Sequence, residues 1–146
     1  MAWFEHNAVR NDDDALTPAE AFAAVAVSSI YTDGQVDDLE DDRFADYLTD
    51  MRLFVALDAR QIQQMLVKIL RLVRDIGEAR LLGRAVKAIP PELKATAFFV
   101  AADLLAVDDR LDERERGFLE ELRRLLKLDA QLAANLVEAV EIKNVG

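Results

Sequence analysis

Hydrophobic residues recur along most of this chain with the 3.6-residue spacing of α-helices. The first helix has a clear start, because Thr17-Pro18-Ala19-Glu20 places Thr17 as N-cap, Pro18 at the first helical position and Glu20 where it closes a capping box. The segment that follows, to about Tyr31, is apolar on nearly every side. A helix without a polar face is buried, so we expect this one at the centre of the fold.

Further helices follow from the same periodicity. We predict a second helix from about Asp37 into the fifties, a third and a shorter fourth before the break at Pro90-Pro91, a fifth from Glu92 to about Val107, and a sixth and seventh after it. The hydrophobic residues that predict the second to fourth helices are Phe44, Tyr47, Leu48, Met51 and Val55 for the second, Ile62, Met65, Leu66, Ile69 and Val73 for the third, and Leu81, Leu82, Ala85, Val86 and Ile89 for the fourth. The last three rest on Leu93, Phe98, Phe99, Val100, Leu104 and Leu105, then on Phe118, Leu119, Leu122 and Leu126, then on Leu132, Leu136, Val137 and Val140. No run alternates with the two-residue period of a half-buried strand, so the predicted class is all-α.

The second half of the chain repeats the first. A shift of 75 residues superposes Ile30 on Leu105, Asp33 on Asp108, Val36 on Leu111, Asp37 on Asp112 and Glu40 on Glu115, and a shift of 71 superposes Leu57-Asp58-Ala59 on Leu128-Asp129-Ala130. We therefore predict a compact bundle of about seven helices in a single domain, residues 1–146, with residues 1–16 as an N-terminal extension. Two three-helix pseudo-repeats, about 17–74 and 91–142, would be related by an approximate twofold axis.

Composition then narrows the chemistry. The chain has 146 residues, and 28 Asp and Glu against 18 Lys and Arg give a net charge of −10, which argues against nucleic-acid binding. There is no Cys for a thiolate nucleophile or a zinc finger, and a lone His6 gives little basis for a Ser/His/Asp triad or a di-iron site. No glycine pattern forms a phosphate-binding loop. The acidic residues are the remaining chemical lead.

These acidic residues form one motif in each half of the chain. In each copy a buried helix is predicted to end in Asp, and further acids follow four and seven residues later. The candidate site residues are Asp33, Asp37 and Glu40 in the first copy and Asp108, Asp112 and Glu115 in the second. Half of the motif has the spacing of a helix capping box, so capping and turn formation are one explanation.

A divalent cation is the other explanation of the acidic motif. Carboxylate and carbonyl oxygens are hard ligands, which favour calcium, magnesium or manganese. The motif is not an EF-hand, because the twelfth position of each loop is Phe44 or Leu119 in place of the required Glu. If the pseudo-twofold axis brings the two turns together, all six acids could share one site.

Charge is also uneven along the chain. Residues 11–50 contain twelve acids and one base, a balance of −11, whereas residues 52–94 contain nine bases and four acids, a balance of +5. The basic stretch is either an ordinary solvated helix surface or a face for an acidic partner or an anionic membrane surface. Apart from Phe54 near its start, no aromatic residue in it is interleaved for base stacking, which argues against single-stranded nucleic acid.

The two motifs resemble those of the TerB-like family, which comprises the tellurite-resistance TerB proteins and their relatives. The resemblance lies in residues 31–40 and 102–116, read as YTDGQVDDLE and ADLLAVDDRLDERER, and extends over most of residues 17–142. It implies a helical domain of two related halves, a divalent-metal site on the six acids named above, and a role in tellurite resistance or stress response. Asp109 stands where the first motif has Gly34, which is a departure between the two copies.

We accordingly expect a non-enzymatic, cytoplasmic protein whose acidic turns bind a divalent cation or a basic partner. The alternative is a scaffold or co-chaperone-like interaction module without a metal site. A protein partner is expected in either case, with a membrane-associated complex as one candidate. Apolar segments are too short to span a bilayer, and the oligomeric state stays open, with a homodimer as one option.

Overall fold

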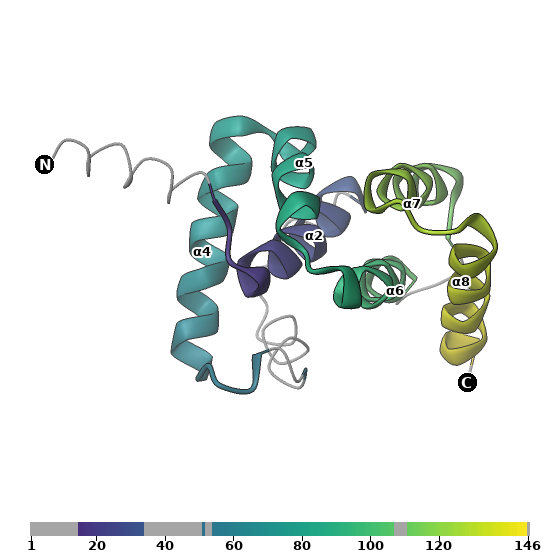
Figure 1. The fold of residues 1–146 in the computed structure, drawn as a ribbon, viewed down its shortest axis with the longest axis horizontal. Helices are drawn as coiled ribbons and strands as arrows, with labels where there is room; N and C mark the ends of the chain where they lie inside the picture. Colours follow the sequence, from purple (N-terminus) through teal and green to yellow (C-terminus); the bar gives the residue numbers. More distant parts are fainter. Residues whose placement is uncertain (1–14, 34–50, 52–53, 107–110, 146) are drawn as a thin grey trace, which may run out of the picture.

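Helix α2 (Pro18–Asp33) lies at the centre of the fold (Figure 1). In the computed structural model, which describes residues 15–33, 51, 54–106 and 111–145, the predicted capping box is present at its start. The N–H of Glu20 donates to Thr17 Oγ1, and the N–H of Thr17 donates to Glu20 Oε1, both at 3.1 Å. Every residue from 21 to 30 is buried, which confirms the prediction made from the apolar character of this helix.

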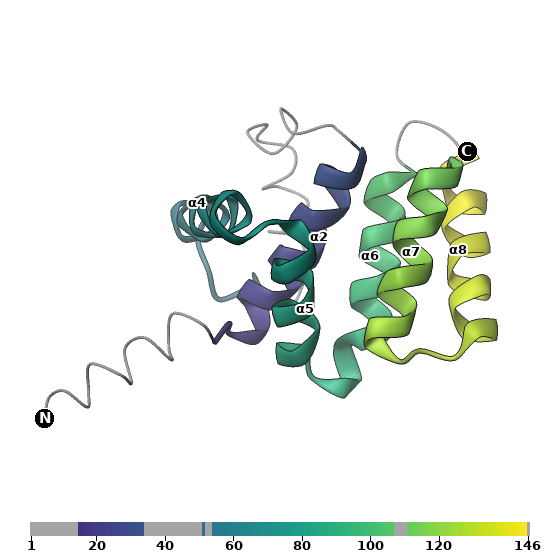
Figure 2. The same ribbon diagram turned by 90° about the horizontal axis from the view of Figure 1, so that it is seen from above.

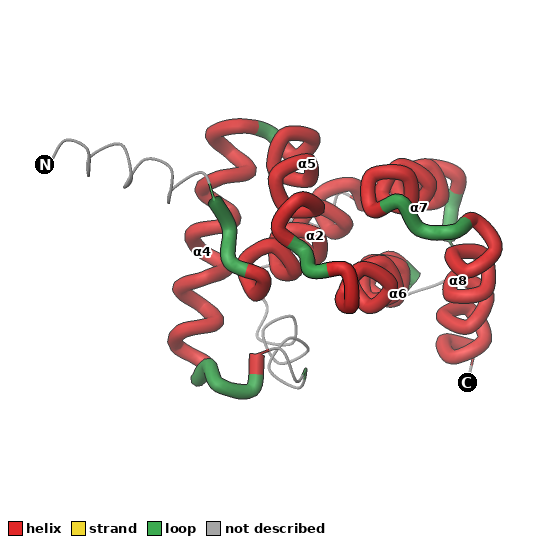
Figure 3. The backbone as a smooth tube through the Cα atoms, in the orientation of Figure 1, coloured by secondary structure: helices red, strands yellow, loops and turns green. Residues whose placement is uncertain are grey.

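The rest of the described chain is also helical. The further elements are α4 (Ala59–Ile76), α5 (Glu78–Ala88), the 3₁₀ helix η3 (Pro91–Leu93), α6 (Lys94–Leu105), α7 (Glu113–Leu126) and α8 (Ala130–Val145). No strand occurs in the ranges that the structure describes, which confirms the all-α class (Figure 3). Most of the predicted second helix lies outside the described residues, so the count of about seven helices stays a prediction.

The end of the predicted second helix needs a correction. Residues 54–57 form a tight turn, in which Phe54 N–H donates to Met51 O at 3.0 Å and Leu57 N–H donates to Phe54 O at 2.9 Å. Such i to i−3 bonds wind the backbone more tightly than an α-helix and change which side chain faces inward. Val55, a predicted core position, is therefore 76% exposed, whereas Phe54 is fully buried.

Helices α2 and α6 form the central pair, and the other helices pack around them. Helices α4 and α5 pack against α2 on one side, and α7 and α8 pack against α6 on the other (Figures 1 and 2). The predicted break precedes α6, since Ile89 is extended before Pro90 and Pro91 opens the short 3₁₀ turn. The two apolar helices thus supply a large share of the core, as expected for helices without a polar face.

Two tight corners connect the outer helices. Gly77 joins α4 to α5 with φ of 86° and ψ of 157°, a backbone conformation that residues other than glycine rarely adopt. Lys127 ends α7 in the left-handed region, and its N–H and that of Leu128 donate to the carbonyls of Arg124 and Arg123, both at 3.1 Å. This is the Schellman arrangement, here formed without glycine.

Helix α8 departs from the predicted core at its first turn. Asp129 Oδ2 accepts the N–H of Leu132 at 3.0 Å, which places Leu132 in the capped first turn. There Leu132 is 40% exposed, and the neighbouring Ala133 faces the core instead. Val140 is fully buried as predicted.

Candidate functional site

The first acidic motif is described only at its beginning. Helix α2 is described as far as Asp33, and residues 34–50 lie outside the described ranges. Asp37 and Glu40 lie outside the described residues, as does Asp108 of the second motif. The predicted convergence of all six acids on one site is therefore still a prediction.

The second motif forms a helix cap around Asp112 and Glu115. Glu115 N–H donates to Asp112 Oδ1 at 2.8 Å, and Asp112 N–H donates to Glu115 Oε1 at 2.9 Å. Glu115 is only 5% exposed, so its carboxylate is held inside the first turn of α7. The structure thus brings these two candidates together in the capping box that was one of the two explanations of their spacing.

The second copy departs from its prediction where its buried helix stops. Helix α6 ends at Leu105, three residues before Asp108, because Ala106 closes the last helical bond to Ala102 O at 3.0 Å and then leaves helical geometry. The expectation that a buried helix ends in Asp is wrong for Asp108, and for Asp33 it stays a prediction, because residues 34–50 lie outside the described ranges. The departure falls just before Asp109, the position at which the two motifs differ in sequence.

The described helix ends next to the two motifs lie toward the same edge of the molecule. Helices α2 and α7 pack against each other, and Figure 2 shows the C-terminal end of α2 and the N-terminal end of α7 on one side. A helix C-terminus carries partial negative charge and a helix N-terminus partial positive charge. Among the residues that the structure describes, no three His, Asp or Glu side chains gather as a metal-binding group.

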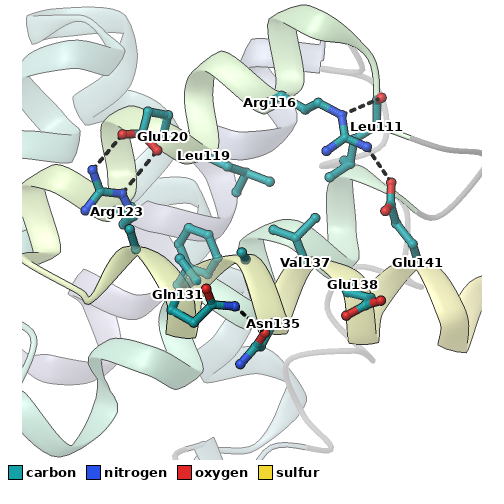
Figure 4. A pocket seen from close by; sticks show the side chains of 14 residues that line it. Leu111, Arg116, Leu119, Glu120, Arg123, Gln131, Asn135, Val137, Glu138 and Glu141 are labelled. Carbon is teal, nitrogen blue, oxygen red and sulfur yellow. Dashed lines mark hydrogen bonds and ion pairs between the residues drawn. The ribbon is translucent and has the colours of Figure 1, made fainter.

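A groove lies beside the described part of the second motif, next to Leu111 and Arg116. It has a volume of about 450 Å³ and lies between α7 and α8, with apolar side chains of Phe98, Leu119 and Val137 on its floor. Figure 4 shows Leu119 and Val137 pointing into it from opposite helices. The lining residues are Phe98, Leu111, Arg116, Leu119, Glu120, Arg123, Ala130, Gln131, Ala133, Ala134, Asn135, Val137, Glu138 and Glu141.

Ion pairs lie at both ends of this groove (Figure 4). Arg116 pairs with Glu141 across the two helices at 2.7 Å, and Arg123 pairs with Glu120 along α7 at 2.6 Å. The hydrogen bond from Arg123 outweighs partial desolvation and lowers the pKa of Glu120. Arg123 also donates to Leu128 O at 3.0 Å, which ties the rim to the α7–α8 corner.

Sequence reasoning missed two buried polar groups in the central helices. Asp103 of α6 lies in the core at 6% exposure and pairs with Lys143 of α8 at 3.2 Å. Ser28 of α2 is fully buried, its hydroxyl has no hydrogen-bond partner in the described structure, and it lines a second cavity of about 270 Å³ with Leu82 and Phe118. Each polar residue was visible as an interruption of an apolar run, but its surroundings depend on helices distant in sequence.

Compared with protein-family models, with curated proteins and with solved structures, the chain gives no match in any of the three. The helices of the described ranges include none that is both long enough and apolar enough to cross a membrane.

Proposed function

We propose that this chain is a non-enzymatic, TerB-like helical protein that acts in tellurite resistance or a wider stress response by binding another protein. The groove between α7 and α8 carries this proposal, because it combines an apolar floor with a charged rim. Interaction sites commonly pair a desolvated apolar centre with a polar edge. The capping role of Asp112 and Glu115 adds support, since it accounts for part of the acidic motif without a bound metal.

The groove favours a helical partner segment with one apolar and one basic side chain. Leu119 and Val137 would receive the apolar side chain. Glu138 lies on the rim without an ion-pair partner among the described residues, so it would receive the basic one. In helix-in-groove binding of this kind, the side chains of the partner that enter the groove are three or four residues apart.

Two alanines of α8 give a matched test. Ala134 lines the groove and is exposed, whereas Ala139 is exposed on the same helix and does not line it. In cells that lack the chain, we expect wild type and Ala139→Arg to restore growth in tellurite, and Ala134→Arg to fail because the long side chain fills the groove. Urea unfolding of both purified variants checks that the folds are equally stable.

Three results would decide against this proposal. If both variants restore growth, the groove is not the surface that binds the partner protein. If both fail while remaining folded, added positive charge on α8 is the cause. If removal of the chain leaves tellurite survival unchanged and wild type adds nothing under oxidative stress, the proposed stress role is wrong.

A divalent-cation site on the acidic turns is the second candidate. It is supported by the helical stretch of α2 that includes Asp33 and by the packing of α2 against α7, which begins directly after Asp112. Thermal unfolding with calcium, magnesium or manganese tests it, because a cation that binds the native state raises the melting temperature. We expect Asp33→Asn and Asp108→Asn to abolish that rise if the two turns share a site. No rise with wild type at millimolar metal would exclude the site.

The pseudo-twofold relation between the two halves is also proposed. Asp58 and Asp129 are 71 residues apart and both cap a helix, since Asp58 Oδ1 accepts Gln61 N–H at 2.8 Å and Asp129 Oδ2 accepts Leu132 N–H at 3.0 Å. Helix α2 packs against α4 as α6 packs against α8. These equivalent caps and contacts support a duplication.

A further inference from the structure

Helix α4 carries a basic stripe on its outer face. The stripe consists of Arg60, Gln64, Val67, Arg71 and Arg74, which are spaced by four, three, four and three residues and are all exposed. This spacing aligns side chains along one side of an α-helix. The opposite side of α4 holds the buried residues Ile62, Met65, Leu66, Ile69 and Val73.

The charges of this stripe are not neutralised within the described protein. Arg60, Arg71 and Arg74 have no ion-pair partner among the residues that the structure describes. Other cations, such as Arg80 and Lys87, also lack an ion-pair partner among the described residues, but several are paired, as Lys68 at the edge of α4 is with Glu20, at 2.8 Å. The long cations of α7 and α8 provide further examples, namely Arg116, Arg123, Arg124 and Lys143.

The stripe also contrasts with the charge of the whole chain. Although the net charge is −10, the stripe contains three guanidinium groups, and the one acid beside it on α4 is the exposed Asp75, four residues after Arg71. At physiological salt an exposed charge acts over about 8 Å, so a ligand that lies on α4 is attracted by the stripe more than it is repelled by distant acids. The centre of the stripe adds an apolar contact, because Val67 is 51% exposed.

We propose that the outer face of α4 binds an acidic segment of a partner protein. Guanidinium groups suit carboxylates because each can form two parallel hydrogen bonds with one. Arg60 and Arg74 are fourteen residues apart, so the stripe extends over about 21 Å, the length of four helical turns. A slender acidic helix can follow that line while staying away from the acidic remainder of the molecule.

An anionic bilayer fits this surface less well. It is a broad, negatively charged plane and would meet much more of a chain with a net charge of −10 than the stripe alone. In addition, the apolar side of α4 is buried in the core, so it is not available for insertion between lipids. This proposal is independent of the groove between α7 and α8, because α4 and α8 lie at opposite ends of the view in Figure 1.

A matched pair of charge reversals tests the proposal. Arg71 lies in the middle of the stripe, and Arg114 is an exposed arginine on α7 that also lacks an ion-pair partner in the described ranges. Arg71→Glu and Arg114→Glu change the net charge equally. The probe is a fluorescein-labelled helical peptide of about sixteen residues, long enough to follow the stripe, with glutamates at every third and fourth position. A peptide with lysine in place of glutamate serves as the control.

Fluorescence anisotropy with the full chain should show binding of the glutamate peptide that weakens as salt is raised. We expect Arg71→Glu to raise the dissociation constant roughly five- to tenfold and Arg114→Glu to leave it nearly unchanged. The triple variant Arg60→Gln, Arg71→Gln, Arg74→Gln should lose binding, whereas the triple Lys variant should keep part of it.

Other outcomes would overturn the proposal. Equal effects of Arg71→Glu and Arg114→Glu would mean that net charge, not the stripe, controls binding. Binding to phosphatidylserine vesicles but not to the glutamate peptide would make a membrane the ligand. Concentration-dependent self-association that Arg71→Glu abolishes would make a second copy of this chain the occupant. Failure of the wild-type chain to bind the glutamate peptide would leave α4 with a solvated face only, while the groove proposal would stand unaffected.

Discussion

The side chains of Asp112 and Glu115 each accept a hydrogen bond from the backbone N–H of the other residue. Removing either side chain therefore removes one of these hydrogen bonds and lowers stability. We expect Asp112→Ala to lower the free energy of unfolding by about 0.5–2 kcal/mol, because one orphan N–H at the start of α7 loses its acceptor. Urea unfolding measures the loss. Asp112→Asn retains a capping oxygen and should lose much less.

The same variants separate capping from metal binding. If Asp112 serves only as a cap, the difference in the free energy of unfolding between wild type and Asp112→Ala stays constant when magnesium or calcium is added. A gap that widens with added metal would show that this carboxylate also contributes to a cation site, since a ligand stabilises the state that binds it.

Ser28 and Ser29 are adjacent on α2, and both are fully buried. Ser29 Oγ donates to Ala26 O at 2.7 Å, whereas the Ser28 hydroxyl has no partner in the described structure. The gain in helix propensity on changing Ser to Ala is the same at both positions, so the difference isolates the hydrogen bond. We expect Ser28→Ala to be more stable than Ser29→Ala by about 1 kcal/mol, measured by urea unfolding. Equal stabilities would mean that a water satisfies Ser28 in solution.

At the scale of elements, Gly77 controls the corner between α4 and α5. A Cβ at this position would meet no atom within 4 Å, so the cost of Gly77→Ala comes from its φ of 86° alone. We expect a loss of about 1–3 kcal/mol, measured by thermal or urea unfolding.

Gly83, in the middle of α5, is the control for this substitution. A Cβ there also meets nothing within 4 Å, and its backbone is helical. Gly83→Ala should therefore stabilise the protein by about 0.5–1 kcal/mol. If both alanine variants stabilised the protein, the corner would not need the conformation found at Gly77.

The contact between α2 and α4 includes an ion pair with a predicted pH dependence. Burial of Glu20 opposes ionisation, but the hydrogen bond from Lys68, the bonds to Thr17 and the positive charge of Lys68 together lower the pKa of Glu20 below its ordinary 4.5. A lowered native pKa means that the unfolded state binds the proton more tightly. This stabilising contribution is therefore present above pH 4.5 and is lost as the pH falls through the native pKa.

Melting temperatures of wild type and Glu20→Gln between neutral pH and pH 3 test this sign. We expect wild type to melt at a higher temperature than Glu20→Gln near pH 7. The difference in melting temperature should disappear as the pH falls. Lys68→Met should remove part of the pH dependence, because the bonds between Glu20 and Thr17 remain. A gap that grew as the pH fell would contradict the lowered pKa.

At the scale of the whole molecule, α2 connects the two sides of the fold. It packs against α4, α5, α6 and α7, and its Phe22 meets Phe54 edge to face with ring centroids 6.1 Å apart. Loss of a fully buried ring at this centre should weaken the entire molecule. We expect Phe54→Ala to cost about 3–5 kcal/mol and to lower one cooperative unfolding transition, as followed by circular dichroism.

Val55, the next residue, is the control. It is 76% exposed, so Val55→Ala should change stability by less than about 0.5 kcal/mol. If Val55→Ala destabilised the protein more than Phe54→Ala, Val55 would be the buried residue, as the predicted helix through residue 55 requires.

The molecule thus presents two candidate surfaces at its opposite ends. The groove between α7 and α8 has an apolar floor, whereas the stripe on α4 is basic and mostly polar. Because the central pair α2 and α6 separates them, one chain could hold two different partners at once. Loss of one activity in Ala134→Arg with retention of acidic-peptide binding would demonstrate that independence.

Most helices of the described fold were predictable, and their caps illustrate why. Thr17 with Glu20, and Asp112 with Glu115, form the reciprocal caps that their three-residue spacing indicated. Periodicity likewise identified the buried side of α4. It failed at Val55 and Leu132, where a tight turn and a capped first turn replace regular helix packing.

The candidate site was less predictable than the helices. The sequence identified the six acids as a pair of motifs, but their spacing alone fits a cap and a metal ligand equally well. The structure assigns capping bonds to Asp112 and Glu115, and the remaining acids keep their predicted role as an expectation. The groove beside them has no sequence signature, because its lining residues come from three helices and from Leu111 before α7.

The sequence by itself determined the helices, their caps and their buried sides, because each depends on residues within about four positions of one another. Only the tertiary structure decided which helices meet. The pairing of Asp103 with Lys143, separated by 40 residues, required α6 and α8 to lie side by side. The same holds for the groove and for the unpaired stripe on α4, since long-range packing decides which charges find a partner and which remain exposed.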